Sequence, residues 1–231
     1  MGLLKNRKAD VEMNTPLNNA AFAVIDTELT GLNGKKDSIV SIGGVRMRGG
    51  RIDVGDSFYM LLKPETALTA ESVVIHEITP TEVLESPEIG LALLKFLEFC
   101  NSDILVGFCL DIDMEFLNRD ARKALGHELP NRTIDIFPIF EWILGKGKPG
   151  PKNGRDMPSQ YRLYDIAGYY GIEVNGVHNA VIDAFITAQI FQRFIPVLID
   201  AGIGSIGDLL SFTANLRGGD RHRIARGLSN F

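Results

Sequence analysis

Residues 21–32 read Ala-Phe-Ala-Val-Ile-Asp-Thr-Glu-Leu-Thr-Gly-Leu, an apolar run that stops at two acids. A continuous apolar run of this length predicts a central strand that is buried on both faces of a sheet. Because side chains i and i+2 of a strand point to the same side, Asp26 and Glu28 should emerge together at the end of this strand. Two carboxylates held so close repel each other unless a cation lies between them, and such oxygen ligands suit Mg²⁺ or Mn²⁺. The alternative for this stretch alone is a strand that runs into an acidic, exposed turn.

The composition is that of a chain that can fold around a hydrophobic core. The sequence has 231 residues, of which 45% are hydrophobic and 23% are charged, and this length fits one domain with tails or at most two small domains. The formal net charge of −5 argues against a module that binds nucleic acid by charge alone. It does not exclude an enzyme whose metal ions offset a cluster of acids.

The cysteines and the apolar segments bear on the cellular compartment. Cys100 and Cys109 give no disulfide framework and no zinc-binding spacing, so we expect buried, reduced thiols. The N-terminus lacks the apolar core of a signal peptide, and no uninterrupted apolar run is long enough to span a bilayer. These observations predict a cytoplasmic protein without a membrane partner.

The rest of the pattern predicts an α/β domain. Residues 38–48 and 51–63 are strand-like and are separated by Gly49-Gly50, which is a signal for a two-residue hairpin. Later strands and helices alternate, so we expect a five-stranded mixed sheet that is flanked by helices. The later strands are expected at residues 104–108 and 133–136, and the helices at residues 69–77, 79–85, 86–100, 111–125, 137–144, 162–170, 179–194 and 205–216.

Three segments divide the chain. Residues 1–19 are polar and without a clear period, which predicts a flexible N-terminal tail, and residues 20–200 form the domain. Residues 201–231 are expected to form a C-terminal helix and a basic tail. Inside the domain, residues 145–160 form a basic loop rich in Gly and Pro, which either contacts phosphates or is simply solvated. The basic residues of this loop are Lys146, Lys148, Lys152 and Arg155.

A second group of acids follows the expected strand at residues 104–108. Asp113 lies near the start of the next helix, at the end of a strand where ligands collect in open α/β sheets. Asp111 and Glu115 lie beside it, but the helix dipole explains these two acids better. Asp113 is therefore the candidate site residue among these three acids.

A histidine and an aspartate frame the start of a later helix. Asn179 is a plausible N-cap, which leaves His178 just before the helix and Asp183 in its early turns. A residue outside the helix can move while one inside it is fixed, and this suits a mobile base beside a rigid ligand. Apart from its neighbours, His178 would be read as a surface or capping histidine.

Taken in order, these segments resemble the motifs of the DEDDh 3′–5′ exonucleases, a family that includes polymerase proofreading subunits. Residues 26–32, Asp-Thr-Glu-Leu-Thr-Gly-Leu, are similar to the first motif, and residues 106–117 are similar to the second, with Asp113 at its acid. Residues 178–183 match the third motif, His-x-Ala-x-x-Asp, and residues 75–79 resemble an intervening segment. The resemblance covers about residues 20–194. This chain departs from the family pattern at Phe108-Cys109, where His-Asn is usual, at Ile112, where Phe is usual, and at Glu77, where Gly is usual.

The resemblance implies a ribonuclease H-like fold and the release of nucleoside 5′-monophosphates from the 3′ end of nucleic acid. It implies two divalent cations, Mg²⁺ or Mn²⁺, with Asp26, Glu28 and Asp183 on the first. Asp26 would bridge to the second cation, which Asp113 would hold directly or through water. His178 would be the general base, since a near-neutral pKa suits that role.

The resemblance also implies a place for the substrate. Leu29 and Leu32 would pack against the terminal base, and Thr27, Thr30 and His76 would seat the 3′ end. The expected partner is nucleic acid with a free 3′ end, with single-stranded DNA as the first choice, and a polymerase or sliding clamp is a further candidate partner. One alternative is an exonuclease that trims RNA or short oligoribonucleotides. Another is a non-catalytic module that binds nucleic acid or a polymerase, although such a module has no need of the five site residues.

Overall fold

A computed structural model of the chain describes residues 10–146, 161–174, 176 and 178–219, with the side chains of residues 217–219 left out. Its centre is a five-stranded sheet in the order β3-β2-β1-β4-β5. β1 pairs antiparallel with β2, and β2 with β3, whereas β4 runs parallel to both β1 and β5. The predicted mixed α/β sheet is therefore confirmed. The strands are β1 (Ala21–Leu29), β2 (Ile39–Arg48), β3 (Arg51–Leu61), β4 (Ile104–Gly107) and β5 (Thr133–Asp135).

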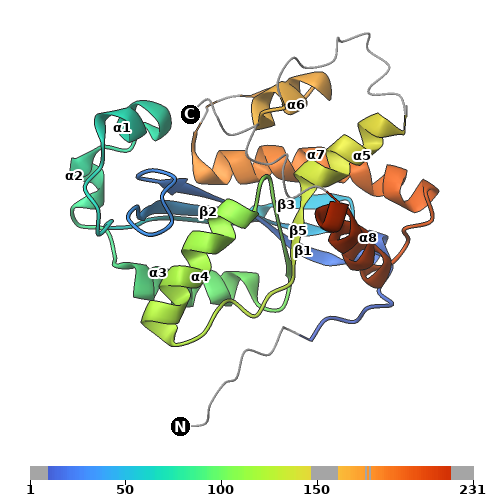
Figure 1. Cartoon of the computed structure of the whole chain (residues 1–231), viewed down its shortest axis with the longest axis horizontal. Coiled ribbons are helices and arrows are strands. Elements are labelled where there is room, and N and C mark those ends of the chain that lie inside the picture. The colour runs from blue at the N-terminus through green and yellow to red at the C-terminus, as the bar shows by residue number, and fades with distance from the viewer. Residues whose placement is uncertain (1–9, 147–160, 175, 177, 220–231) are drawn as a thin grey trace.

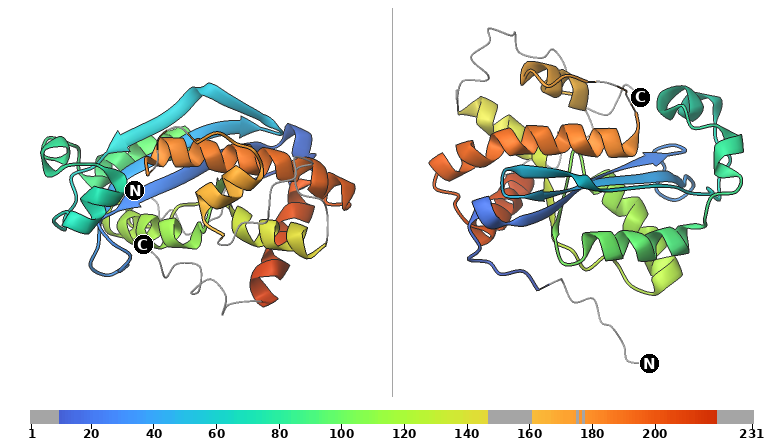
Figure 2. Two further views of the ribbon diagram at one scale, coloured as in Figure 1. Left: turned by 90° about the horizontal axis from the view of Figure 1, so that it is seen from above. Right: turned by 180° about the vertical axis from the view of Figure 1, so that it is seen from behind.

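Helices cover both faces of this sheet (Figures 1 and 2). The longest helix, α7, runs along β1 and β2 on one face, and α5, α6 and α8 pack on the same side. α3 and α4 cover the other face, and α1 and α2 lie at one end of the sheet. The helices are α1 (Ala70–His76), α2 (Pro80–Val83), α3 (Ile89–Cys100), α4 (Asp111–Leu125), α5 (Ile136–Gly145), α6 (Leu163–Tyr169), α7 (Ala180–Asp200) and α8 (Ile206–Gly219).

The side chains of β1 alternate between the two hydrophobic cores. Phe22 and Val24 point into the core under α7, whereas Ala23 and Ile25 point into the core under α3 and α4. All four side chains are fully buried, as predicted for a central strand. By the same alternation, even-numbered residues farther along β1 face α7 and odd-numbered residues face α4.

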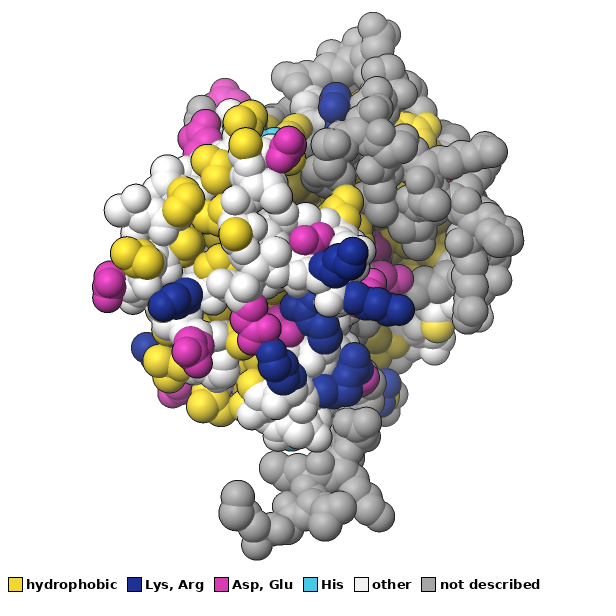
Figure 3. Space-filling view, turned by 60° about the vertical axis from the view of Figure 1, so that its left-hand side comes forward, with side chains coloured by type: hydrophobic (Ala, Val, Ile, Leu, Met, Phe, Trp, Pro, Cys, Tyr) yellow, Lys and Arg dark blue, Asp and Glu magenta, His cyan; other side chains and the backbone are white. Residues whose placement is uncertain are grey.

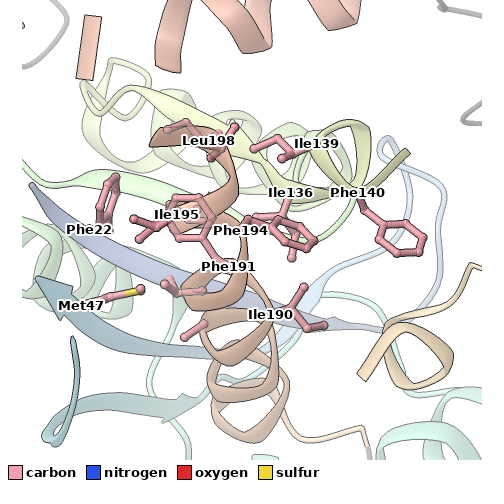
Figure 4. Close-up of a cluster of buried hydrophobic side chains, with 14 of the residues drawn as sticks. Phe22, Met47, Ile136, Ile139, Phe140, Ile190, Phe191, Phe194, Ile195 and Leu198 are labelled. Atoms are coloured by element: carbon pink, nitrogen blue, oxygen red, sulfur yellow. The ribbon is translucent and has the colours of Figure 1, made fainter. Parts of the chain in front are cut away.

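The core under α7 is built largely from aromatic and branched side chains, drawn in Figure 4. The rings of Phe22 and Phe191 meet edge to face, with centroids 5.1 Å apart. Phe194 stacks on Phe140 of α5, so α7 joins the sheet to α5. Complete burial of one such side chain contributes about 1.5–3 kcal/mol to the stability of the fold.

α7 differs from the prediction in length, and it is apolar along much of it. The helix was expected to end near residue 194, ahead of Pro196, but it continues to Asp200. By length and composition alone this helix could cross a membrane, but the core helix of a globular domain passes the same test.

Residues 10–19 do not form the predicted loose tail. Pro16 pairs with Ser205 in an isolated β-bridge, and the Leu17 N–H donates to the carbonyl of Gly204 at 2.9 Å. The Leu17 side chain is fully buried. The prediction was wrong because these contacts join segments far apart in the sequence, so no local pattern reveals them. Residues 1–9 lie outside the described residues.

α8 belongs to the same body as the sheet and is not a separate appendage. Ile206 and Leu209 are buried in the core under α7, and Phe212 meets the ring of Trp142 of α5 edge to face, at 5.0 Å. The helix extends to Gly219, three residues beyond its expected end, and the basic tail after it lies outside the described residues.

The other boundaries agree with the predictions to within a few residues. α4 begins and ends where expected, and α3 begins at Ile89 instead of residue 86. β1 runs four residues past Ile25, because Asp26 through Leu29 remain paired with β2. The two acids of the opening motif therefore lie within the strand and not in a turn after it.

Candidate active site

Three carboxylates converge on the α7 side of the sheet. Asp26 and Glu28 lie opposite Gly43 and Ser41 of β2, and both face α7, as the alternation along β1 requires. Asp183 reaches them from the first turn of α7. One oxygen atom from each of the three acids lies within 4.8 Å of the other two. The structure thus brings together the three residues predicted for the first cation.

Burial and mutual repulsion raise the pKa values of these acids. The pKa of Asp26 lies well above its usual value because the carboxyl is desolvated and because Asp113 and Asp183 are close. Burial, followed by the charges of Asp183 and Asp113, raises the pKa of Glu28 to about 8. Burial raises the pKa of Asp183 to about 6. A divalent cation would offset this repulsion, and a set of oxygen donors fits Mg²⁺ or Mn²⁺.

Asp113 approaches the same region from the opposite face of the sheet. It lies in the first turn of α4, and its Oδ1 accepts hydrogen bonds from the Thr27 hydroxyl at 2.6 Å and the Thr27 N–H at 3.0 Å. Thr27 is the odd-numbered residue between the two acids of β1, so it faces α4. Burial raises the pKa of Asp113 to about 7, although the Thr27 hydrogen bonds lower it. Both Thr27 hydrogen bonds go to the same oxygen, Oδ1 of Asp113.

His178 lies immediately before α7, as predicted. Asn179 is the N-cap, since its Oδ1 accepts from the Val181 N–H at 3.2 Å. The backbone of His178 is left-handed, with φ at +54°, which is uncommon for a residue other than glycine. Burial lowers the pKa of the imidazole, while the nearby carboxylate of Glu77 raises it. The neutral imidazole at pH 7 is therefore able to accept a proton.

Gly43 is a site residue that the sequence analysis missed. A Cβ on Gly43 would lie 2.1 Å from the carbonyl carbon of Ala180 and 2.2 Å from the nitrogen of Val181. Only glycine lets the start of α7 come this close to β2, directly opposite Asp26. The available signal was the Gly43-Gly44 pair in the middle of a strand, since a glycine there often marks a close backbone approach.

Tyr164 of α6 is the second residue that was missed. Its hydroxyl donates to the carboxylate of Asp183, with distances of 2.9 and 2.7 Å to the two oxygens. The same hydroxyl oxygen accepts a hydrogen bond from the His178 N–H at 2.7 Å. Burial and the Asp183 charge raise the pKa of Tyr164, so the hydroxyl stays protonated. No local sequence pattern marks this contact.

The two threonines predicted to seat the substrate have contacts inside the protein. The Thr27 hydroxyl holds Asp113, as described above. The Thr30 side chain is 3% exposed, and its hydroxyl accepts from the Ser38 N–H at 2.9 Å, which closes the loop between β1 and β2. The Thr30 side chain is thus engaged inside this loop, and substrate contact by the Thr27 and Thr30 region stays a prediction.

The remaining predicted substrate residues lie in different environments. Leu32 is 48% exposed, whereas Leu29 is half-buried and packs against the core under α4. His76 is buried, and its Nδ1 accepts from the Ile78 N–H at 3.0 Å, so in the neutral ring Nε2 carries the hydrogen. Among the described residues this Nε2 has no hydrogen-bond partner. The contacts of Leu29, Leu32 and His76 with substrate stay predictions.

The departures from the family pattern have local consequences. Cys109 has a left-handed backbone, with φ at +51°, and its N–H donates to Asp135 at 3.0 Å. Asparagine, the usual residue here, tolerates this conformation better than most residues do. Glu77 likewise has φ at +58° at the C-cap of α1, where glycine is the usual choice. Both cysteines are free, and burial raises their pKa values.

The face drawn in Figure 3 carries basic side chains mixed with acids. Lys123 pairs with Glu65, and Arg122 pairs with Glu128, so these cations are partly neutralised. In the predicted basic loop, Lys146 lies over the ring of Trp142 at 5.9 Å. Lys148, Lys152 and Arg155 lie outside the described residues, so phosphate binding by this loop stays a prediction.

Comparisons with known proteins agree with this geometry. A family described as Exonuclease matches residues 23–191. The chain is 30% identical over 202 residues to a DNA polymerase III subunit epsilon of Aquifex aeolicus, covering 87% of this chain and 94% of that protein. It is 27% identical to a PolC-type DNA polymerase III of Thermotoga petrophila, of which it covers only 14%.

A solved structure with the same fold is that of E. coli exonuclease I in complex with a dT13 oligonucleotide. The TM-score is 0.66 at 18% sequence identity, and the match covers 79% of this chain and 43% of that one. The observed sheet, with helices on both faces, is thus that of the ribonuclease H-like exonucleases.

Proposed function

We propose that this chain, which belongs to the Exonuclease family and is a 3′–5′ exonuclease, acts on single-stranded DNA. It hydrolyses the strand from the 3′ end and releases nucleoside 5′-monophosphates. We propose DNA and not RNA as the substrate because the relatives are DNA polymerase subunits and domains. A DNA polymerase is accordingly the proposed protein partner.

One observation carries the proposed mechanism. Asp26, Glu28 and Asp183 place oxygen atoms within 4.8 Å of one another, in surroundings that raise the pKa of all three. We assign these acids to one Mg²⁺ or Mn²⁺, and we assign Asp26 and Asp113 to a second. When bound, two such ions supply an activated water and neutralise charge on the attacked phosphate.

The protein residues contribute proton transfer and positioning. His178 takes the proton of the attacking water, and its lowered pKa keeps the imidazole neutral and ready to accept. Thr27 fixes Asp113 by two hydrogen bonds, so this acid is held in one orientation. We assign His76 to the 3′ end of the substrate from the resemblance; its Nε2 is buried and has no hydrogen-bond partner among the described residues. The exposed side chain of Leu32 can pack against the terminal base.

The test uses matched single-stranded DNA and RNA with a 5′ label, incubated with Mg²⁺, Mn²⁺ or EDTA. Asp183→Asn removes the negative charge of a proposed metal ligand. Asp200→Asn is the matched control, because Asp200 lies on the same helix but is exposed at its other end. We expect a ladder that shortens from the 3′ end with wild type and with the control, and none with Asp183→Asn or in EDTA.

The outcomes separate the candidate functions. Faster shortening of RNA than of DNA would replace the proposed substrate with RNA while keeping the chemistry. Turnover by Asp183→Asn equal to that of wild type would refute the metal assignment. A folded wild-type protein that binds the strand and cleaves neither nucleic acid would favour a partner-dependent enzyme or a binding module.

A further inference from the structure

Tyr164 contacts two residues with different proposed roles, the metal ligand Asp183 and the base His178. Its hydroxyl donates to the Asp183 carboxylate and accepts from the His178 N–H, at 2.7–2.9 Å. The ring also meets the imidazole edge to face, with centroids 5.2 Å apart. One side chain on α6 therefore touches both a proposed metal ligand and the proposed base.

The helix that carries Tyr164 is well anchored. On α6, Ile166 is 1% exposed and Ala167 is fully buried in the core under α7. α6 also packs directly against α7, the helix that begins just after His178. The hydroxyl is thus held by a fixed element, while His178 lies in the segment before α7 with a left-handed backbone. A fixed hydrogen-bond partner is the means by which such a segment keeps one conformation.

We propose that Tyr164 is a positioning residue, which fixes the Asp183 carboxylate and the His178 backbone relative to each other. This inference rests on the proposed function and deepens it. A hydroxyl has only one hydrogen, so Tyr164 can leave one oxygen of Asp183 free for a cation while it holds the other. Its oxygen still accepts the His178 N–H. The base and the metal ligand are then held by one group.

The test compares Tyr164→Phe with Tyr169→Phe on the same helix. Tyr164→Phe removes the hydroxyl and keeps the ring beside His178, and the ring of Tyr169 packs against Phe140 and Tyr170, away from the acids. The readouts are Mn²⁺ affinity by calorimetry without substrate, kcat and KM on labelled single-stranded DNA, and the melting temperature. Removal of a partner that holds a metal ligand typically costs 10–100-fold in affinity or activity.

We expect Tyr164→Phe to bind Mn²⁺ about 10-fold more weakly and to lose about 10–100-fold in kcat with little change in KM. Tyr169→Phe should keep wild-type values. Wild-type Mn²⁺ affinity and kcat in Tyr164→Phe would overturn the inference and leave the proposed function intact. Equal losses in both variants would also overturn it, because they would show a general packing effect. A wild-type protein that binds no Mn²⁺ would overturn the proposed metal site and this inference with it.

Discussion

Replacing Gly43 by alanine should move Asp183 of α7 away from Asp26 and Glu28 of β1. The added Cβ would lie 2.1 Å from the carbonyl carbon of Ala180, whereas ordinary contacts begin at 3.4 Å, so the start of α7 or β2 must move by about 1.3 Å. The clash is with backbone atoms, so no change of rotamer relieves it. Asp183 lies on the first turn of α7 and would move away from Asp26 and Glu28.

A misplacement of about 1 Å can cost 10²-fold in rate, so we expect Gly43→Ala to lower kcat by about 100-fold. The free energy of unfolding should fall by about 1–3 kcal/mol, as for other overpacked sites. The assay is single-turnover cleavage of labelled single-stranded DNA at saturating Mn²⁺, together with urea unfolding.

Gly90→Ala is the matched control for this substitution. Its Cβ would lie 3.7 Å from the Cβ of Ala124, an ordinary contact, and alanine is favoured over glycine inside a helix by about 0.5–1 kcal/mol. The control should keep wild-type turnover and gain slightly in stability. If Gly43→Ala turned over as fast as Gly90→Ala, the close approach of α7 to β2 would not be what assembles the site.

Three further predictions concern single side chains. Thr27→Val removes the hydroxyl that holds Asp113, so the Mg²⁺ concentration for half-maximal activity should rise about 10-fold, and an unchanged requirement would refute this role. Glu77→Gly removes the strain of a left-handed backbone at a residue with a side chain, so the melting temperature should rise. The substitution also removes the carboxylate that raises the pKa of His178, so this pKa should fall and the acid limb of the pH–rate profile should move to lower pH. A move of the acid limb to higher pH would contradict this reasoning. In EDTA, the stability that protonated Glu28 contributes is fully present below pH 4.5 and is lost as the pH rises through about 8. Urea unfolding should therefore show a steeper loss of stability from pH 5 to pH 8 in wild type than in Glu28→Gln, and equal slopes would refute the shift.

The sequence could predict the acids because their pattern is local. An apolar run followed by Asp26 and Glu28 indicates a buried strand with two carboxylates on one side, and the observed pairing with β2 agrees. The capping role of Asn179, and with it the place of His178 ahead of α7, also follows from neighbours in the sequence. These inferences need only the geometry of one strand or one helix end.

The supporting residues could not be predicted because their contacts are distant in sequence. Thr27 and Asp113 are 86 residues apart, and Gly43 meets a helix that begins at Ala180. The Tyr164 hydroxyl reaches Asp183 only because α6 packs on α7. Such contacts depend on which elements the folded sheet brings together, and hydrophobic periodicity does not encode that.

The pairing of residues 13–17 with residues 204–207 also has a consequence for the order of folding. The N–H of Ile206 donates to the carbonyl of Thr15 at 3.0 Å, and that of Gly207 to the carbonyl of Met13 at 2.8 Å, so this closure joins segments about 190 residues apart. Closing so long a loop is entropically expensive and slow. On the ribosome, residues 13–17 are made early, but their backbone hydrogen-bond partners in residues 204–207 emerge about 190 residues later. A chain stopped at the end of α7 would carry every proposed catalytic residue and still lack the backbone hydrogen bonds between residues 13–17 and residues 204–207.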